Sequence, residues 1–259
     1  MKRIEDLIVE DLRWLNTTSF VLVLSGSKAC RDIVPGNFAE IRVDGHPGVF
    51  LRRPFSYLDA DEKKGHVSFF IKVLGKGSKK LGELKKGETV NIIHPLGNAF
   101  SIPKNKKVLI TGGGSGIAPF IMLGRELKAN GNEVIILTGG RTAEDILFTE
   151  EFSQYGKVYC TTEDGTLGEK GLITNHSIFN NGHAGFDMIY TCGPEGMMKA
   201  VSRIAAERGT NCEASLENLM ACGFGVCLCC IQETDKGNLC VCTEGPVFNT
   251  KSLKWETSA

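Results

Sequence analysis

The sequence predicts a β-barrel followed by a doubly wound α/β domain and a short cysteine-rich C-terminal segment. Short alternating apolar runs fill residues 5–100, strands alternate with helices from about residue 106, and cysteines dominate after residue 211. The 259 residues suffice for about two domains of roughly 100 to 200 residues each and a small appendage. The predicted segments are 1–103, 104–210 and 211–259.

Five runs in the first segment are predicted to be antiparallel strands, because apolar residues alternate in them and turn residues bound them. These runs are SFVLVLSG, NFAEIRVDG, GVFLRRPFSY, HVSFFIKVLG and ETVNIIHPLG. Such a set of short strands is typical of a sheet or barrel.

The second segment alternates buried strands with helices. KKVLITGGGSGIAPFIMLGRELKANG contains an apolar run, a glycine-rich turn and a helix that we expect to stop at Asn130-Gly131. NEVIILTGGR and KVYCTTEDG are two further strands, and FDMIYTCGPEGMMKAVSRIAAERG is a strand followed by a helix. This alternation predicts a parallel, doubly wound sheet.

Charge and hydropathy exclude several classes of protein. Thirty basic residues balance thirty acidic ones, so no nucleic acid or other polyanion is indicated as a partner. The first residues, MKRIEDLIVEDLRW, lack the apolar core of a signal peptide, and no run reaches the roughly 18 apolar residues of a membrane-spanning helix. We therefore expect a cytoplasmic protein with no membrane partner. Its ten cysteines are then reduced, which disfavours disulfides.

Two turns of the second segment mark strand ends where a dinucleotide can bind. The GGGSG turn at 112–116 follows a strand and opens a helix, so backbone N–H groups and the positive end of the helix dipole converge on a site for a pyrophosphate. TCGPEGM at 191–197 marks a second strand end on the same edge of the sheet. A tight turn without a ligand is the alternative for the glycines.

Two motifs of the first segment are candidate phosphate sites. Arg53 of RPFS can hold a phosphate, while Ser56 and the backbone beside Pro54 can face a heteroaromatic ring. The GKGS turn at 75–78 suits close approach to a diphosphate. The alternative for RPFS is a strand end with a surface arginine.

The cysteine pattern of the third segment points to an iron–sulfur cluster. Cys222, Cys227 and Cys230 stand as C-x4-C-x2-C with cysteines downstream, which is the spacing of plant-type [2Fe–2S] proteins. Zinc sites more often pair two C-x2-C units, and a zinc site or buried structural thiols are the alternatives. Spacing alone leaves the fourth ligand open between Cys240 and Cys242.

In this order the motifs resemble the ferredoxin–NADP reductase superfamily, in which a flavin-binding barrel precedes a nicotinamide-binding domain. The resemblance covers most of the chain and implies that FAD and NAD are its cofactors. The FAD contacts that it implies include Arg53, Pro54, Phe55, Ser56, Gly77 and Ser78. The dinucleotide contacts that it implies are Gly112, Gly113, Gly114, Gly116, Cys192, Gly193 and Pro194.

MACGFGVCLCC and VCTEGPVF are similar to the electron-transfer subunits of NAD-dependent, two-component dihydroorotate dehydrogenases. In that family the last cluster ligand precedes GPVF, which implies Cys242 here. RRPFS, GKGS and HPLGNAF share the similarity. The ligand set implied by spacing and resemblance together is Cys222, Cys227, Cys230 and Cys242.

Five further residues are candidate contacts. In the resembled family, the stretch that corresponds to Phe70, Ile71 and Lys72 binds the flavin and more often contains an aromatic residue and an arginine. A lysine cannot make the two parallel hydrogen bonds to a phosphate that an arginine makes. Glu163 and Asp164 follow the third strand of the second segment and can accept from ribose hydroxyls. Two carboxylates would repel a 2′-phosphate and favour NAD over NADP, while an acidic surface turn is the alternative.

The predicted function is an electron relay. Nicotinamide carries electrons in pairs, a [2Fe–2S] cluster takes one at a time, and a flavin does both. The resemblance implies an FMN-containing dihydroorotate dehydrogenase catalytic subunit as partner in a heterotetramer of two plus two, with electrons passing through [2Fe–2S] and FAD to NAD+. No catalytic acid–base or nucleophilic constellation is indicated. The alternatives are the NAD(P)-side subunit of a soluble hydrogenase or of a ferredoxin:NADP transhydrogenase, and an iron or redox sensor.

Overall fold

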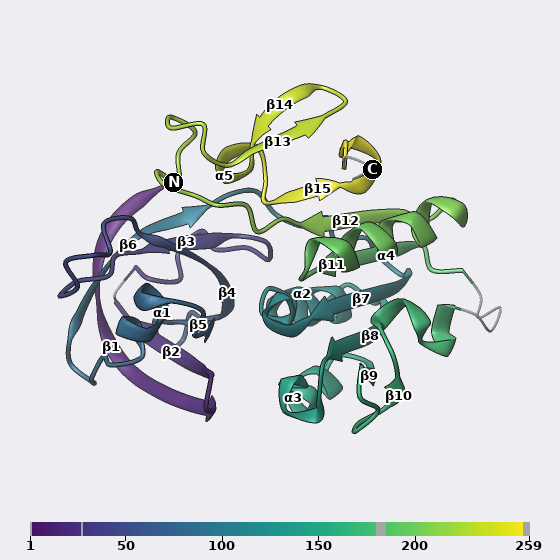
Figure 1. The fold of residues 1–259 in the computed structure, drawn as a ribbon, viewed down its shortest axis with the longest axis horizontal. Helices are drawn as coiled ribbons and strands as arrows, with labels where there is room; N and C mark the ends of the chain where they lie inside the picture. The colour runs from purple at the N-terminus through teal and green to yellow at the C-terminus, as the bar shows by residue number, and fades with distance from the viewer. Residues whose placement is uncertain (1, 27, 180–184, 256–259) are drawn as a thin grey trace. The chain divides into compact units, whose positions relative to one another are not determined.

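The computed structural model describes residues 2–26, 28–179 and 185–255 (Figure 1). The chain divides into two compact units. The barrel unit comprises residues 1–99, 218–231 and 240–246, and the sheet unit comprises residues 100–217, 232–239 and 247–259. The cysteine-rich segment is thus shared between the two units, and the predicted boundaries near residues 103 and 211 stay predictions.

Six antiparallel strands close the barrel in the order β1-β2-β5-β4-β3-β6, which confirms the predicted barrel. They are β1 (Arg3–Asn16), β2 (Ser19–Ser25), β3 (Phe38–Ile41), β4 (Arg53–Asp61), β5 (His66–Lys72) and β6 (Thr89–Leu96). The five predicted runs form β2 to β6. Strand β1 was not among those runs, although its Leu7 and Val9 are buried and alternate with the exposed Asp6 and Ile8.

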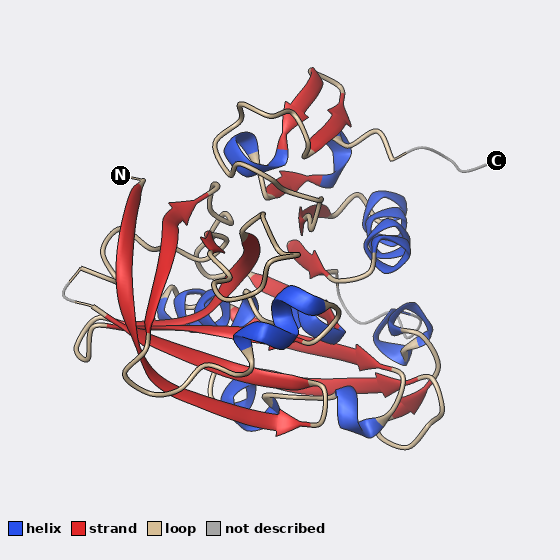
Figure 2. Ribbon diagram, turned by 60° about the vertical axis from the view of Figure 1, so that its left-hand side comes forward, coloured by secondary structure: helices blue, strands red, loops and turns tan. Residues whose placement is uncertain are grey.

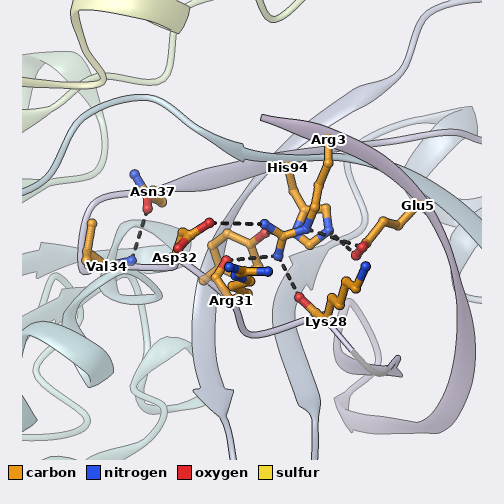
Figure 3. Close-up of polar contacts among 9 residues, drawn as sticks. Arg3, Glu5, Lys28, Arg31, Asp32, Val34, Asn37 and His94 are labelled. Atoms are coloured by element: carbon orange, nitrogen blue, oxygen red, sulfur yellow. Dashed lines mark hydrogen bonds and ion pairs between the residues drawn. The ribbon is translucent and has the colours of Figure 1, made fainter. Parts of the chain in front are cut away.

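A chain of polar side chains ties β1 to the barrel interior (Figure 3). The Tyr57 hydroxyl lies 2.8 Å from His94 Nδ1, and His94 Nε2 lies 2.9 Å from a carboxylate oxygen of Glu5. Because an ionised carboxylate only accepts hydrogen bonds, His94 Nε2 carries the proton and Nδ1 accepts from Tyr57. Burial lowers the pKa of His94, so the ring is neutral near pH 7. Arg3 pairs with Glu5 at 3.3 Å at the barrel rim.

Seven strands form the second sheet in the order β10-β9-β8-β7-β11-β12-β15. They are β7 (Lys107–Gly113), β8 (Glu133–Gly140), β9 (Lys157–Thr162), β10 (Glu169–Lys170), β11 (Met188–Cys192), β12 (Asn211–Ser215) and β15 (Val247–Asn249). Every pair is parallel except β12 with β15, which confirms the doubly wound prediction. The chain reverses direction across the sheet between β7 and β11, and ligands of such sheets bind at this switch point.

Helices connect the strands of the sheet unit and are few in the barrel unit (Figure 2). The α-helices are α1 (Lys76–Leu81), α2 (Phe120–Ala129), α3 (Thr149–Ser153), α4 (Glu195–Glu207) and α5 (Val241–Glu244), and a hairpin of β13 (Ile231–Thr234) and β14 (Gly237–Cys240) precedes α5. The predicted stop of α2 is confirmed, since Gly131 has a φ of 76° that favours glycine. No helix in the described ranges is long and apolar enough to cross a bilayer.

Candidate flavin, dinucleotide and iron–sulfur sites

The two predicted flavin motifs lie together in the barrel unit. Residues 53–56 occupy the first half of β4 and are half-buried. An added Cβ at Gly77, in the first turn of α1, would lie 2.8 Å from Nε of Arg53, so a larger residue would require the arginine side chain to shift. The Ser78 hydroxyl accepts hydrogen bonds from the N–H groups of Leu74 and Gly75 at 3.0 and 3.2 Å. Gly77 and Ser78 therefore lie in the first turn of α1, beside a guanidinium that can bind a phosphate.

The third predicted flavin segment ends β5, next to β4 in the barrel. Ile71 is fully buried in the barrel core and Phe70 is also buried. Their side chains therefore support the barrel wall, and Ile71 can offer a flavin only its main chain. Lys72 is half-buried at the end of the strand.

The glycine-rich turn and the CGP segment of the sheet unit are in direct contact. An added Cβ at Gly116 would lie 2.3 Å from the Cys192 carbonyl oxygen and 2.5 Å from the Gly193 Cα. An added Cβ at Gly113 would lie 3.0 Å from Cδ of Pro194. Gly112 and Gly113 are the last residues of β7, and Cys192 is the last residue of the adjacent parallel strand β11. The predicted dinucleotide residues thus meet at the switch point of the sheet.

Glu163 and Asp164 follow β9 at the same edge, and both side chains are exposed. Strand β8 separates β9 from β7 and its glycine-rich turn. The Asp164 carboxylate accepts from the Thr166 N–H at 3.0 Å and hydroxyl at 2.7 Å, and these bonds hold its pKa below the ordinary value. Asp164 is thus engaged in its own turn, and Glu163 is the better placed of the two to meet a ribose.

The cysteine loop, residues 218–231, belongs to the barrel unit together with α5, and the two segments fold around the sulfur atoms of Cys230 and Cys242. The Gly225 N–H donates to Cys242 Sγ at 3.1 Å, and the Cys242 N–H donates to Cys230 Sγ at 3.4 Å. Gly225 has a φ of 80°, a conformation that lets its N–H turn inward. Cys240 lies nearby, with Sγ 4.0 Å from the Gly225 carbonyl oxygen. The choice of Cys242 over Cys240 as the fourth ligand stays a prediction.

The loop also lowers the pKa of the Cys222 thiol, which favours its thiolate form. Slight burial acts to raise the pKa of this thiol, but N–H groups of Phe224, Cys227 and Val226 outweigh it and lower the pKa to about 6. Burial and the neighbouring Cys230 instead raise the pKa of Cys242 to about 12. Metal ligation requires the thiolate, so N–H groups directed at sulfur suit the predicted cluster.

Within the described ranges, no three His, Cys, Asp or Glu side chains converge as they would around a single metal ion. A [2Fe–2S] cluster has two irons, so its four sulfurs need not converge on one point. The chemistry of the loop, with thiols, N–H donors directed at sulfur and glycines at positive φ, therefore fits a cluster better than a mononuclear zinc ion.

One buried acid beside this loop was not anticipated from sequence. Glu40 on β3 is fully buried, and an added Cβ at Gly223 would lie 3.0 Å from its Cγ. In NFAEIRV the glutamate alternates with apolar residues, which is typical of a solvent-facing strand position. The cysteine loop, which is distant in sequence, packs against this side chain.

Comparisons with known proteins agree with this arrangement. Three family models match: an oxidoreductase FAD-binding domain at residues 10–100, an oxidoreductase NAD-binding domain at 110–203, and the iron–sulfur cluster binding domain of dihydroorotate dehydrogenase B at 217–254. The fold and these sites define a flavoprotein oxidoreductase of the ferredoxin reductase type with a C-terminal iron–sulfur segment.

Curated relatives narrow the class. The dihydroorotate dehydrogenase B (NAD(+)) electron transfer subunit of Fusobacterium nucleatum is 33% identical over 264 residues, covering 98% of this chain and 100% of the relative. The subunit of the same name from Caldanaerobacter subterraneus is 40% identical over 218 residues, covering 83% and 84% of the two chains. The chain belongs to the family of dihydroorotate dehydrogenase B electron transfer subunits.

A solved structure of an NADH-dependent reduced ferredoxin–NADP oxidoreductase, described for flavin-based electron bifurcation, is also similar. It has a TM-score of 0.88 and 27% identity, covering 96% of this chain and 90% of that one. A ferredoxin reductase of carbazole 1,9a-dioxygenase, with a TM-score of 0.69 and 22% identity over 81% of this chain and 67% of that one, shares the fold.

Proposed function

We propose that this chain passes electrons from a catalytic dihydroorotate dehydrogenase subunit to NAD+ in pyrimidine biosynthesis. The partner would contain FMN and oxidise dihydroorotate to orotate, and the electrons would travel through the [2Fe–2S] cluster and FAD of this chain. One observation carries the proposal. FAD-, NAD- and cluster-binding segments occur together in this chain, and the chain matches the whole length of a dihydroorotate dehydrogenase B electron transfer subunit.

The residues of the chain bind and orient the three cofactors. We assign the phosphates of FAD to Arg53 and the GKGS turn, because the guanidinium and the turn are packed together. The dinucleotide is assigned to the joined turns at 112–116 and 192–194. The cluster is assigned to Cys222, Cys227, Cys230 and Cys242.

The exposed face of the cysteine loop supports docking of the partner at this loop. Its large apolar side chains are exposed, with Leu219 at 84% and Val226 at 75%. Phe224 and Leu228 add to the same loop. Clustered exposed apolar residues mark protein interfaces, and a partner covering them would bring its own redox centre toward the cluster.

The assembly that we propose is a cytoplasmic heterotetramer of two catalytic and two electron-transfer subunits. All ten cysteines lie in the described residues and none of them forms a disulfide, which suits a reducing compartment. The mass of the complex purified with its partner, measured by light scattering, tests the stoichiometry.

The proposed electron path is tested by measuring two reactions separately: NADH oxidation by this chain alone, and dihydroorotate-dependent NAD+ reduction by the chain with its partner. The chain without its partner is expected to oxidise NADH with an artificial dye but not to use dihydroorotate. Adding the FMN subunit is expected to give dihydroorotate-dependent NAD+ reduction. Cys222→Ser should abolish the coupled reaction and retain most NADH–dye activity, whereas Cys229→Ser, at an exposed non-ligand, should retain both. Coupled turnover without the cluster would refute the path.

The similarity to the NADH-dependent reduced ferredoxin–NADP oxidoreductase favours a second candidate, a subunit that exchanges electrons with ferredoxin and NADP. The two candidates differ in the partner that co-purifies with the chain. A partner that oxidises dihydroorotate supports the first, and a complex that reduces ferredoxin with pyridine nucleotides supports the second.

A further inference from the structure

Glu40 is an unusual residue for the place that it occupies. Its side chain is fully buried, and neither carboxylate oxygen has a hydrogen-bond partner among the described residues. Glutamate is almost never fully buried without a partner, because an ionised carboxylate loses much hydration free energy there. A buried carboxylate that loses this hydration free energy without gaining a hydrogen bond is a candidate for a functional role.

The position of Glu40 links it to the cysteine loop. Strand β3 pairs with β4 at Pro54 and with β6 at Ile93, so Glu40 sits in the middle of the barrel wall. An added Cβ at Gly223 would be 3.0 Å from Cγ and 3.7 Å from Oε1 of Glu40. Gly223 directly follows Cys222, so the Glu40 side chain packs against the backbone next to this predicted cluster ligand.

Few groups offset this charge. The Arg52 guanidinium donates to the main-chain oxygen of Glu40 at 3.3 Å but does not bond its carboxylate. Burial raises the pKa of Glu40 to about 7, with Arg52 and Arg53 opposing the rise and the charge of Cys222 adding to it. Because Glu40 is fully buried, an ionised carboxylate there acts on the neighbouring cysteine loop with little screening by water.

We propose that the buried negative charge of Glu40, beside the cysteine loop, lowers the reduction potential of the cluster. This inference rests on the proposed cluster at Cys222. Reduction adds one electron to the cluster without making or breaking a bond, and a fixed negative charge in a low-dielectric setting opposes that addition. A lower potential favours onward transfer of the electron from the cluster to the flavin of this chain.

The test measures the midpoint potential of the cluster in the purified full chain. Redox titration with dithionite, followed by electron paramagnetic resonance, is run at about pH 9 for wild type, Glu40→Gln and Glu40→Leu, so that a carboxyl group with a pKa of about 7 is ionised. Asp44→Asn is the matched control, because Asp44 is an exposed carboxylate on the same barrel that pairs with Arg42 at 2.9 Å.

Both Glu40 variants are expected to shift the cluster potential in the positive direction, and Asp44→Asn is expected to leave it unchanged. Iron content and flavin absorbance should match wild type in all four proteins. Potentials equal to wild type in both Glu40 variants would overturn the proposal. So would a shift in Glu40→Gln alone, which would assign the effect to a new N–H donor, or loss of iron from both variants, which would assign Glu40 to holding the loop. Wild-type protein without iron would refute the cluster itself.

Discussion

Replacing Gly116 by alanine tests whether the two turns at the switch point form the dinucleotide site. The added Cβ would lie 2.3 Å from the Cys192 carbonyl oxygen, 2.4 Å from its carbon and 2.5 Å from the Gly193 Cα. All three are main-chain atoms, which cannot rotate away. Ordinary contacts begin near 3.4 Å, so the two turns must separate by about 1 Å.

The loss of stability in Gly116→Ala can be compared with that of other overpacked sites, where extra atoms destabilise proteins by about 1–3 kcal/mol. Because both contact partners are strand ends of a parallel sheet, we expect the upper part of that range. A misplacement of about 1 Å in a binding site can lower a rate by about 100-fold. The Gly116→Ala chain is therefore expected to lose between roughly tenfold and 100-fold in kcat/KM for NADH, with unchanged flavin and cluster absorbance.

The assay is NADH–dye reduction by the isolated chain together with thermal unfolding. Gly185→Ala is the control, because an added Cβ at this exposed position meets nothing within 4 Å. A substitution on the surface away from such contacts should leave the stability close to that of wild type. Equal NADH kinetics in the two variants would refute the contact between the turns and its role.

Three other predictions concern separate features. Cys242→Ser should lose the cluster, measured by iron content and electron paramagnetic resonance, whereas Cys240→Ser should keep it; the reverse result would exchange the ligand assignment. NADH should reduce the flavin with a higher kcat/KM than NADPH in stopped-flow experiments, and Glu163→Gln should narrow the difference more than Asp164→Asn, whose carboxylate is engaged in its turn. Burial lowers the pKa of His94 from its ordinary 6.5, so the unfolded chain binds more protons and stability falls as pH drops below about 6.5. His94→Gln should weaken that decline in urea unfolding followed between pH 8 and pH 5, and an unchanged pH slope would contradict the neutral, buried ring.

Local patterns in the sequence were sufficient for most of the fold. Alternation over two residues marked β2 to β6, and the alternation of apolar strands with helices marked the doubly wound sheet. Cysteine spacing likewise indicated three cluster ligands, because a cluster needs ligands at fixed short separations in one loop. These signals depend on neighbours along the chain, which a sequence displays directly.

Contacts between distant segments were decided only by the tertiary structure. The packing of Gly116 against Cys192 joins residues that are far apart in sequence, and so does the packing of Gly223 against Glu40. The C-terminal segment adds β15 antiparallel to β12 while its cysteine loop covers the barrel, a division that no local pattern indicates. The sequence by itself determined which cofactors the chain is built to bind, because each binding motif is local. The tertiary structure alone placed a buried charge beside the cysteine loop, because burial depends on which remote residues fold over a side chain.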